Sequence, residues 1–318
     1  MRFFRGGGGS AGVSPEQQAE QLARAERSRQ MVEGGGIPLE AEERIERQRQ
    51  EGATFTSDLS VDELAALRGI GYRPVALVMG SSLYRMGWIN TGMGILSGRS
   101  SMSWGAVEPL ENAALTSALF EARSRAVHRL VLEATGLKAE GVVGVRLEIK
   151  RWEWATGMAE FTVLGTAVRR IGEAPASEPF TSTLNGQDMA KLVMAGYRPL
   201  RLVMGASAFQ AVAFFGGSLG MMGQGAVSAW SNQEVASYTR ALRLAQATGR
   251  QRMAQEAGQA GSSGVVGVEI DSHILEYPTG SESVGGRIVE WVILGTAVAP
   301  QASPTELPRP SMVVPLRP

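Results

Sequence analysis

The sequence repeats itself, and this repetition constrains the fold more than any other feature. Residues 55–80 and 180–205 share the signatures Phe-Thr-Ser, Gly-Tyr-Arg-Pro and Leu-Val-Met-Gly at the same spacing. Further along, Gly-Val-Val-Gly-Val stands at residues 141–145 and again at 264–268. Because the shared segments keep their order from end to end, we predict two tandem copies of one domain. A residue that both copies need for chemistry should then be kept in both.

The repeats also predict how the chain is divided. We expect a polar helical arm at residues 1–54, a first copy at 55–170, a linker at 171–179, a second copy at 180–299 and a Pro-rich, disordered tail at 300–318. A length of 318 residues suits two domains of ordinary size. The copies should therefore carry the folded core.

The N-terminal arm shows two helix signals. Ser14 as N-cap, Pro15 at the first helical position and Gln17 as capping-box partner predict a helix to about Val32. A second polar helix should follow Pro38 and run to about residue 50, with an apolar stripe too narrow to anchor a core. We expect a solvated or frayed arm, and the alternative is an arm that binds a protein partner.

Within each copy the hydrophobic period changes in the same order. A capping box at Ser60 and Glu63 opens a short helix, and the apolar runs 75–79 and 200–204 predict a short buried strand. A long helix over about 107–135 follows, with small and apolar residues along one face. Strands near 143–149 and 160–168 form a hairpin. The predicted fold is α+β, with a long helix packed on a mostly antiparallel sheet.

Charge and cysteine content exclude several functional classes. The chain has 31 basic and 31 acidic residues, so it lacks the positive field expected of a nucleic-acid-binding protein. It contains no cysteine, which excludes disulfides, thiolate metal sites and cysteine nucleophiles and suits a reducing cytoplasm. The N-terminal residues do not resemble a signal peptide, and we expect a cytoplasmic protein.

Several motifs resemble those of the YbjQ-like family, whose members are often labelled heavy-metal-binding domain proteins. They are Gly98-Arg99-Ser100, Glu121-Ala122-Arg123, the Gly-Val-Val-Gly-Val strand and a closing Gly-Thr-Ala-Val at 165–168. The second copy lacks the first two, so any role of those residues belongs to the first copy. The resemblance implies a small α+β domain that forms pentameric rings, and five chains would give ten domains in two stacked layers. It implies no particular activity.

The titratable residues kept in both copies form no recognised catalytic group. Arg129 with Glu133, and Arg252 with Glu256, lie four residues apart and predict ordinary helix-surface ion pairs. No phosphate-binding glycine loop is present. We therefore expect no enzyme activity. The retained positions are Arg73/Arg198, Glu111/Glu234, Arg129/Arg252, Glu133/Glu256, Glu153/Glu276 and Glu160/Glu290.

A divalent metal or a small ligand could bind in the second copy. Glu269, Asp271 and His273 alternate along one predicted strand, which brings their side chains to one face. Two of the same positions in the first copy are the cations Arg146 and Lys150, so such a site would be private to the second copy. The alternative is a solvent-facing polar strand without a cofactor.

Residues 202–233 contain no charge and are rich in glycine. A membrane span is one interpretation, but the glycines and polar side chains argue against it. We favour a glycine-rich apolar loop that packs against a neighbouring subunit or lines the opening of a ring. Candidates for this interface or pore are Phe209, Phe214, Phe215, Met221, Met222, Trp88 and Ile95.

Together these observations predict a non-enzymatic homo-oligomer, a ring-forming scaffold in which each chain supplies two similar subunits. The first alternative is a metal- or ligand-binding module that uses the second copy. The second alternative is a membrane-associated assembly. A protein partner for the arm or for the Pro-rich tail is also conceivable.

Overall fold

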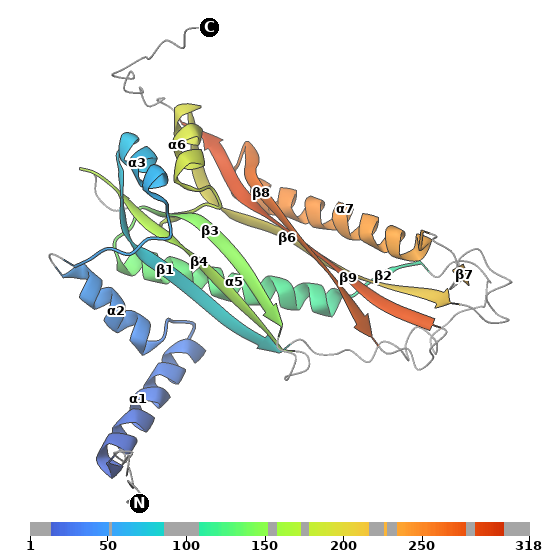
Figure 1. The fold of residues 1–318 in the computed structure, drawn as a ribbon, viewed down its shortest axis with the longest axis horizontal. Helices are drawn as coiled ribbons and strands as arrows, with labels where there is room; N and C mark the ends of the chain where they lie inside the picture. Colours follow the sequence, from blue (N-terminus) through green and yellow to red (C-terminus); the bar gives the residue numbers. More distant parts are fainter. Residues whose placement is uncertain are drawn as a thin grey trace, which may run out of the picture.

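The computed structural model describes residues 14–50, 53–85, 108–151, 158–172, 178–215, 226–227, 234–277 and 284–301. Two twisted sheets lie beside each other, with long helices along their outer sides (Figure 1). We call residues 53–172 the first half and residues 178–301 the second half. Each half repeats one order of elements: short helix, long strand, long helix and hairpin.

The first half builds a four-stranded sheet in the order β1-β4-β3-β5. Strands β1 and β3 both pair antiparallel with β4, whereas β5 joins the outer edge of β3 in parallel. Since β5 comes from the second half, this sheet is completed by the other repeat. The elements are α3 (Val61–Gly69), β1 (Tyr72–Arg85), α5 (Ala113–Gly136), β3 (Gly141–Arg151), β4 (Met158–Arg170) and β5 (Phe180–Thr181).

The second half builds a five-stranded sheet in the order β2-β6-β9-β8, with β7 also paired to β6. Here β2 comes from the first half, so the exchange of strands runs both ways. The elements are β2 (Leu110–Glu111), α6 (Gly186–Met194), β6 (Tyr197–Phe215), β7 (Ala226–Val227), α7 (Ala236–Gln259), β8 (Gly264–Tyr277) and β9 (Val284–Pro300).

The same bulges occur in both halves. The register of the first strand shifts after Pro74 and again after Pro199. The first strand of each hairpin has a bulge at a glycine with positive φ, Gly144 in β3 and Gly267 in β8. This bulge interrupts the alternation of side chains between the two faces of β3. The shared irregularities confirm the predicted α+β fold and show that the repeat extends to backbone detail.

The repeated Leu-Val-Met-Gly signature has a packing reason. A Cβ atom on Gly80 would lie 1.9 Å from the carbonyl oxygen of Ala126 in α5, and one on Gly205 would lie 1.7 Å from that of Gly249 in α7. Only glycine lets the helix backbone come this close to the strand. Small residues of the long helices, Ala126 and Gly249, thus lie where the strand comes closest.

The two long strands exceed their predicted lengths. We expected residues 202–233 to form mainly a loop, but β6 continues to Phe215, and β1 likewise runs to Arg85. Long strands were missed because small residues fill their inner positions, so the apolar signal fades along the strand. Helix α5 begins at Ala113, later than expected, where the Asn112 side chain accepts a hydrogen bond from the Leu115 amide. Across the described ranges, no helix is long and apolar enough to cross a membrane.

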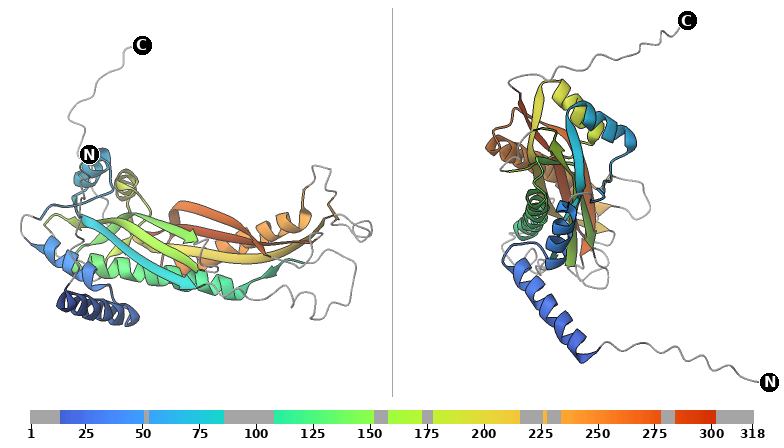
Figure 2. Two further views of the ribbon diagram at one scale, coloured as in Figure 1. Left: turned by 60° about the horizontal axis from the view of Figure 1, so that its bottom comes forward. Right: turned by 90° about the vertical axis from the view of Figure 1, so that its left-hand side faces the viewer.

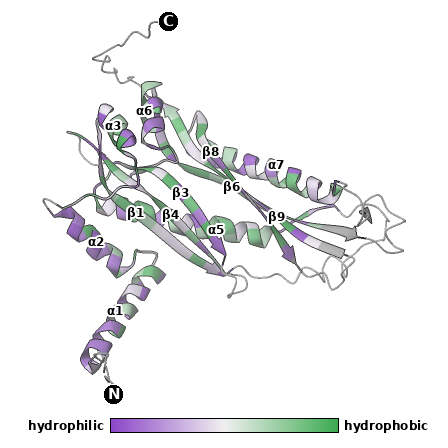
Figure 3. Ribbon diagram, viewed as in Figure 1, coloured by the Kyte–Doolittle hydropathy of each residue, from purple (hydrophilic) through white to green (hydrophobic). Residues whose placement is uncertain are grey.

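The arm forms the two predicted helices, α1 (Pro15–Glu33) with its capping box and α2 (Leu39–Arg49). Contrary to the expectation of a solvated arm, α2 docks on the first half. Its outer surface is mostly hydrophilic (Figure 3), but Ile37 and Ile45 are buried in the main hydrophobic cluster. Ile45 reaches Gly136 of α5, where the missing side chain makes room for it. Two isoleucines therefore provide the apolar anchor where the sequence showed too narrow a stripe.

Candidate assembly interface

The contact between the two halves is a strand addition. The backbone of residues 180–184 runs along the free edge of β3, and four hydrogen bonds of 2.8–3.0 Å hold it there. We call this edge of β3, with the start of α5, the tail surface of the first half. The matching segment 178–194 and the outer face of β6 form the head surface of the second half. The bonds join Phe180 N to Glu140 O, Ser182 N to Val142 O, Val145 N to Ser182 O and Gly144 N to Leu184 O.

One aromatic side chain makes this strand addition specific. The Phe180 ring covers Gly141, where a Cβ atom would lie 2.3 Å from the ring. Its other neighbour is Tyr72, whose ring meets Phe180 edge-on with centroids 6.2 Å apart at 87°. Tyr72 is buried in this contact, and Val145, whose amide bonds to Ser182, is buried as well. The tail surface thus needs a glycine for the incoming phenylalanine.

Helices extend the contact on both sides of this strand pair. Helices α3 and α6 lie side by side (Figures 1 and 2), and Gly186 of α6 sits against the Glu63 backbone of α3. The start of α5 reaches over β6 of the second half, where the Thr116 hydroxyl accepts a 3.1 Å hydrogen bond from the Ala208 amide. Leu119 is buried there in a cluster that spans both halves. The interface is a continuous core, of the kind found in permanent assemblies.

Ion pairs across this contact use the acidic residues that both copies keep. Arg252 holds Glu111 at 2.5 and 3.1 Å, and Arg123 holds Glu256 at 3.0 Å. Glu256 also accepts a 2.8 Å bond from the Met204 amide. The predicted pair between Arg252 and Glu256 on one helix is therefore wrong, because each side chain instead bonds across the interface. These residues hold the halves together.

The equivalent pair in the first half was also predicted incorrectly. Glu133 pairs with Arg44 of the arm and accepts a 2.9 Å bond from the Met79 amide, while Arg129 donates to the carbonyls of Ser81 and Val32. Burial raises the pKa of Glu133 above its usual value, and the Met79 bond and Arg44 oppose that shift.

A third acidic residue, Glu290 of β9, is buried and pairs with Arg151 at the end of β3. Arg151 therefore reaches from the first sheet to the second. Leaving either charge alone at this depth would be costly, so the pair requires both halves to be in register.

Each end of the chain leaves the matching surface uncovered. In the second half, Val268 is 45% exposed whereas its equivalent Val145 is 0% exposed, and Gly264 faces open space where Gly141 meets Phe180. In the first half, Met79 is 44% exposed whereas its equivalent Met204 is 1% exposed. The tail surface of the second half and the head surface of the first half are thus free. Other exposed apolar residues on them are Phe55, Leu83, Tyr197, Ile270 and Ile274.

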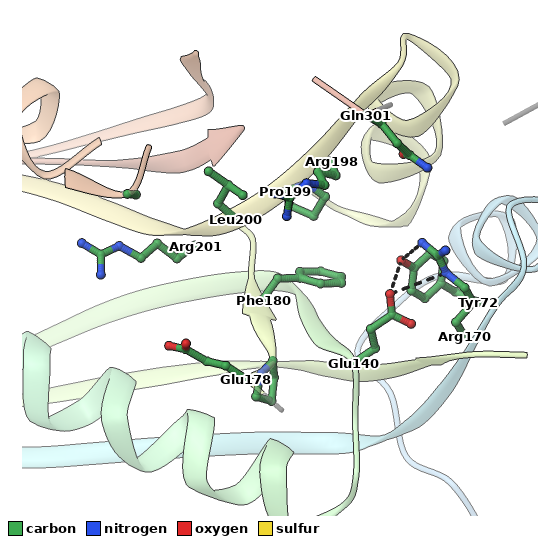
Figure 4. A pocket seen from close by; sticks show the side chains of 12 residues that line it. Tyr72, Glu140, Arg170, Glu178, Phe180, Arg198, Pro199, Leu200, Arg201 and Gln301 are labelled. Atoms are coloured by element: carbon green, nitrogen blue, oxygen red, sulfur yellow. Dashed lines mark hydrogen bonds and ion pairs between the residues drawn. The ribbon is translucent and has the colours of Figure 1, made fainter. Parts of the chain in front are cut away.

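A pocket lies at the junction of the halves (Figure 4). Tyr72 donates a 2.9 Å hydrogen bond to Glu140 and accepts a 2.8 Å bond from Arg170, whose guanidinium carbon lies 5.1 Å from the tyrosine ring centroid. Burial raises the pKa of Tyr72 to about 12, so the phenol stays protonated at neutral pH. These groups satisfy one another, which indicates a structural network and not an acid–base pair.

The candidate metal ligands lie on β8. His273 Nε2 is 3.0 Å from Asp271 Oδ2, and both side chains are largely accessible. Within the described residues, no group of three or more histidine, cysteine or acidic side chains could hold a metal ion. Asp271 and His273 lie together, and Glu269 does not join them in a group of three. A metal at these residues stays a prediction without structural support.

The predicted interface and pore residues fall in different environments. Phe209 is buried under α7 beside Trp291 and Ala245, so it packs in the core of its own half. Phe214 and Phe215 end β6, and only their backbones are described. The remaining candidates, Met221, Met222, Trp88 and Ile95, lie outside the described residues.

The sequence reasoning missed the free surfaces, although a signal existed. Val268, Ile270 and Ile274 alternate along β8, and the equivalents of the first two in β3 are the apolar residues Val145 and Leu147. An apolar face on the edge strand of the second copy implies a missing cover. Comparing the faces of the equivalent strands in the two copies would have located this uncovered surface.

Two comparisons with known proteins returned matches. A family model described as "Putative heavy-metal-binding" and named YbjQ_1 matches residues 107–170 and 224–301. The "Encapsulin nanocompartment protein Rv1762c" of Mycobacterium tuberculosis is 35% identical over 269 residues, which cover 83% of this chain and 92% of that protein. No solved structure matched the chain.

Proposed function

Because this chain belongs to the YbjQ family and shares most of its length with an encapsulin nanocompartment protein, we propose that it is a non-enzymatic structural subunit that assembles with copies of itself. The assembly is a shell or scaffold. A cytoplasmic location, expected from the absence of cysteine, remains part of this proposal.

The proposal rests on the contact between the two halves, because the chain also exposes both surfaces needed to make the same contact with another chain. The chain contains one complete contact between a head surface and a tail surface, and it leaves one free surface of each kind. Such head-to-tail contacts build closed rings or open filaments, because each added copy again exposes the surface that the next copy needs. Large apolar side chains exposed on both surfaces favour covering them.

The internal contact predicts the atoms of the contact between chains. Phe180 is opposite Gly141 and Thr181 is opposite Val142 in the strand pair, so Phe55 of one chain should lie opposite Gly264 of another. The Phe55 side chain is 51% exposed and available for this. We propose that it covers Gly264 and meets the Tyr197 ring edge-on, as Phe180 does with Gly141 and Tyr72.

We further propose that the assembly closes into a ring in which each chain supplies two successive units. A repeated contact sets the halves side by side in one ring, and not in two stacked layers. A ring of five chains would hold ten units, twice the number in the pentameric rings that the family resemblance implies.

The test is the particle mass over a range of protein concentrations. Wild-type protein should form particles several times heavier than the 33.8 kDa chain, and Ile270→Asp on the free tail surface should remain monomeric. Leu22→Asp, at an exposed site of α1, is the matched control and should assemble normally. A wild-type protein that stays monomeric at tens of micromolar would exclude self-assembly through these surfaces.

A further inference from the structure

The N-terminal arm contacts residues of the first half whose equivalents in the second half contact the first half. Arg252 of α7 donates to the carbonyl of Ala206 and to Glu111 of the other half. Its equivalent Arg129 donates to Ser81, the counterpart of Ala206, and to the carbonyl of Val32 at the end of α1. The arm therefore places a backbone carbonyl where the second half receives a carboxylate.

A second pair of equivalent contacts also has the arm in the place of the other half. Glu256 of α7 is paired with Arg123 from the other half, and its equivalent Glu133 of α5 is paired with Arg44 from α2 of the arm. Both carboxylates also accept an amide of the neighbouring strand, so their positions correspond closely. Two independent side-chain contacts thus put the arm beside the head surface of the first half, against Arg129 and Glu133 of α5.

The displaced partner can be named from the repeat. Glu111 pairs with β6 opposite Phe209 and reaches Arg252 from there. The equivalent of Glu111 is Glu234, which is exposed beside the start of α7, and the equivalent of Phe209 is Tyr84 of β1. A second chain docking in this way would bring Glu234 next to Tyr84 and within reach of Arg129.

We propose that Arg129 and the β1 edge are the docking site for Glu234 and the start of α7 of a second copy, and that the arm competes for this site within the chain. This inference rests on the proposed self-assembly. Docking replaces a 3.5 Å contact to a carbonyl by a charge-assisted pair with a carboxylate. Within the described residues no carboxylate pairs with Arg129, and its half-buried cation lies near that of Arg125.

The exchange also has a cost, which makes the arm a brake on assembly. At the position equivalent to Arg123, α7 carries Gln246, which can donate a hydrogen bond to Glu133 but brings no charge. Compared with the arm, the next chain therefore forms a stronger contact with Arg129 and a weaker contact with Glu133. Loosening the arm should favour assembly, and removing the charge of Glu234 should oppose it.

The first experiment is a charge exchange in the full-length protein, read by particle mass across concentrations. Glu234→Arg should raise the concentration for half assembly by about tenfold or more, as expected for a lost ion pair between chains. Adding Arg129→Glu in the same chain should restore assembly toward the wild type. Glu148→Arg, an exposed charge reversal on β3, is the matched control and should behave as the wild type.

The second experiment releases the arm without touching the docking site. Ile45→Asp should detach α2 and lower the concentration for half assembly several-fold, whereas Leu22→Asp on the exposed side of α1 should not change it. This variant keeps the inference testable should Arg129→Glu fail to fold.

The outcomes separate this inference from the proposed function. If the wild type assembles and Ile270→Asp prevents it, but Glu234→Arg assembles like the wild type, the docking site is wrong and self-assembly stands. If Ile45→Asp assembles no more readily than Leu22→Asp, the arm does not compete. If no variant assembles under any condition, the proposed function itself fails.

Discussion

Gly264 offers the sharpest test of whether the internal contact is reused between chains. Both copies keep glycine here, yet only Gly141 has a reason within the chain, because a Cβ atom there would lie 2.3 Å from the Phe180 ring. A Cβ atom on Gly264 would meet nothing within 4 Å, and its backbone is not in the left-handed region. Gly264→Val should therefore fold normally and fail to bind Phe55 of the next chain.

The expected loss of binding free energy between chains follows from the equivalent contact of Phe180 with Gly141 inside the chain. Burying a phenylalanine side chain fully contributes about 1.5–3 kcal/mol, so covering the exposed half of Phe55 contributes about 1 kcal/mol. Forcing a valine into the space of the ring costs about 1–3 kcal/mol more. A total of at least about 2 kcal/mol per contact corresponds to about thirtyfold in the dissociation constant.

The assay combines thermal unfolding with particle mass over a dilution series. Gly141→Val is the matched variant, since the same substitution should there lower the midpoint of unfolding by disturbing the contact inside the chain. Gly264→Val should leave the unfolding of the dissociated chain unchanged and shift assembly to higher concentration. The reasoning is refuted if Gly264→Val assembles at wild-type concentrations, or if both variants unfold alike.

Three further predictions concern the folded chain. Gly80→Ala and Gly205→Ala should each destabilise the protein by more than about 1 kcal/mol in chemical denaturation, because the new Cβ atoms would lie 1.9 and 1.7 Å from helix carbonyls; unchanged midpoints would contradict the packing. Arg151→Ala should cost about 3–5 kcal/mol of unfolding free energy by stranding the buried Glu290, and adding Glu290→Gln should recover part of it. Tyr72 has a pKa raised to about 12, so the folded state binds its proton more tightly than the unfolded state, and stability should fall as pH rises from about 10 to 12. Absorbance titration of the phenols should show a late step that Tyr72→Phe removes.

Much of the local structure was predictable because its signals are local. The capping boxes at Ser14 and Ser60 begin helices where expected, and the repeat correctly indicated two units of the same fold. The small and apolar residues along one face of the expected long helix correctly indicated the side that packs on the sheet. Each of these features depends on neighbours within a few residues or on a direct comparison of the copies.

The missed features depend on contacts between distant parts of the chain. Arg252 and Glu256 are four residues apart on one helix, and nothing local indicates that each bonds to the other half instead. The docking of α2 rests on two isoleucines and on a missing side chain at Gly136. Pairing across an interface is set by tertiary geometry, which the spacing of charges along one helix does not contain.

The fusion of two units in one chain restricts how many units a closed assembly can hold. Each chain adds two, so a ring closed only through the head-to-tail contact has an even number of units, and ten is reached with five chains whereas five is never reached. If the curvature of the contact favoured five units per turn, one half of some chain would be left outside the ring. That half would carry its own free surface away from the ring plane, and a duplicated chain would then act as a bridge between neighbouring rings.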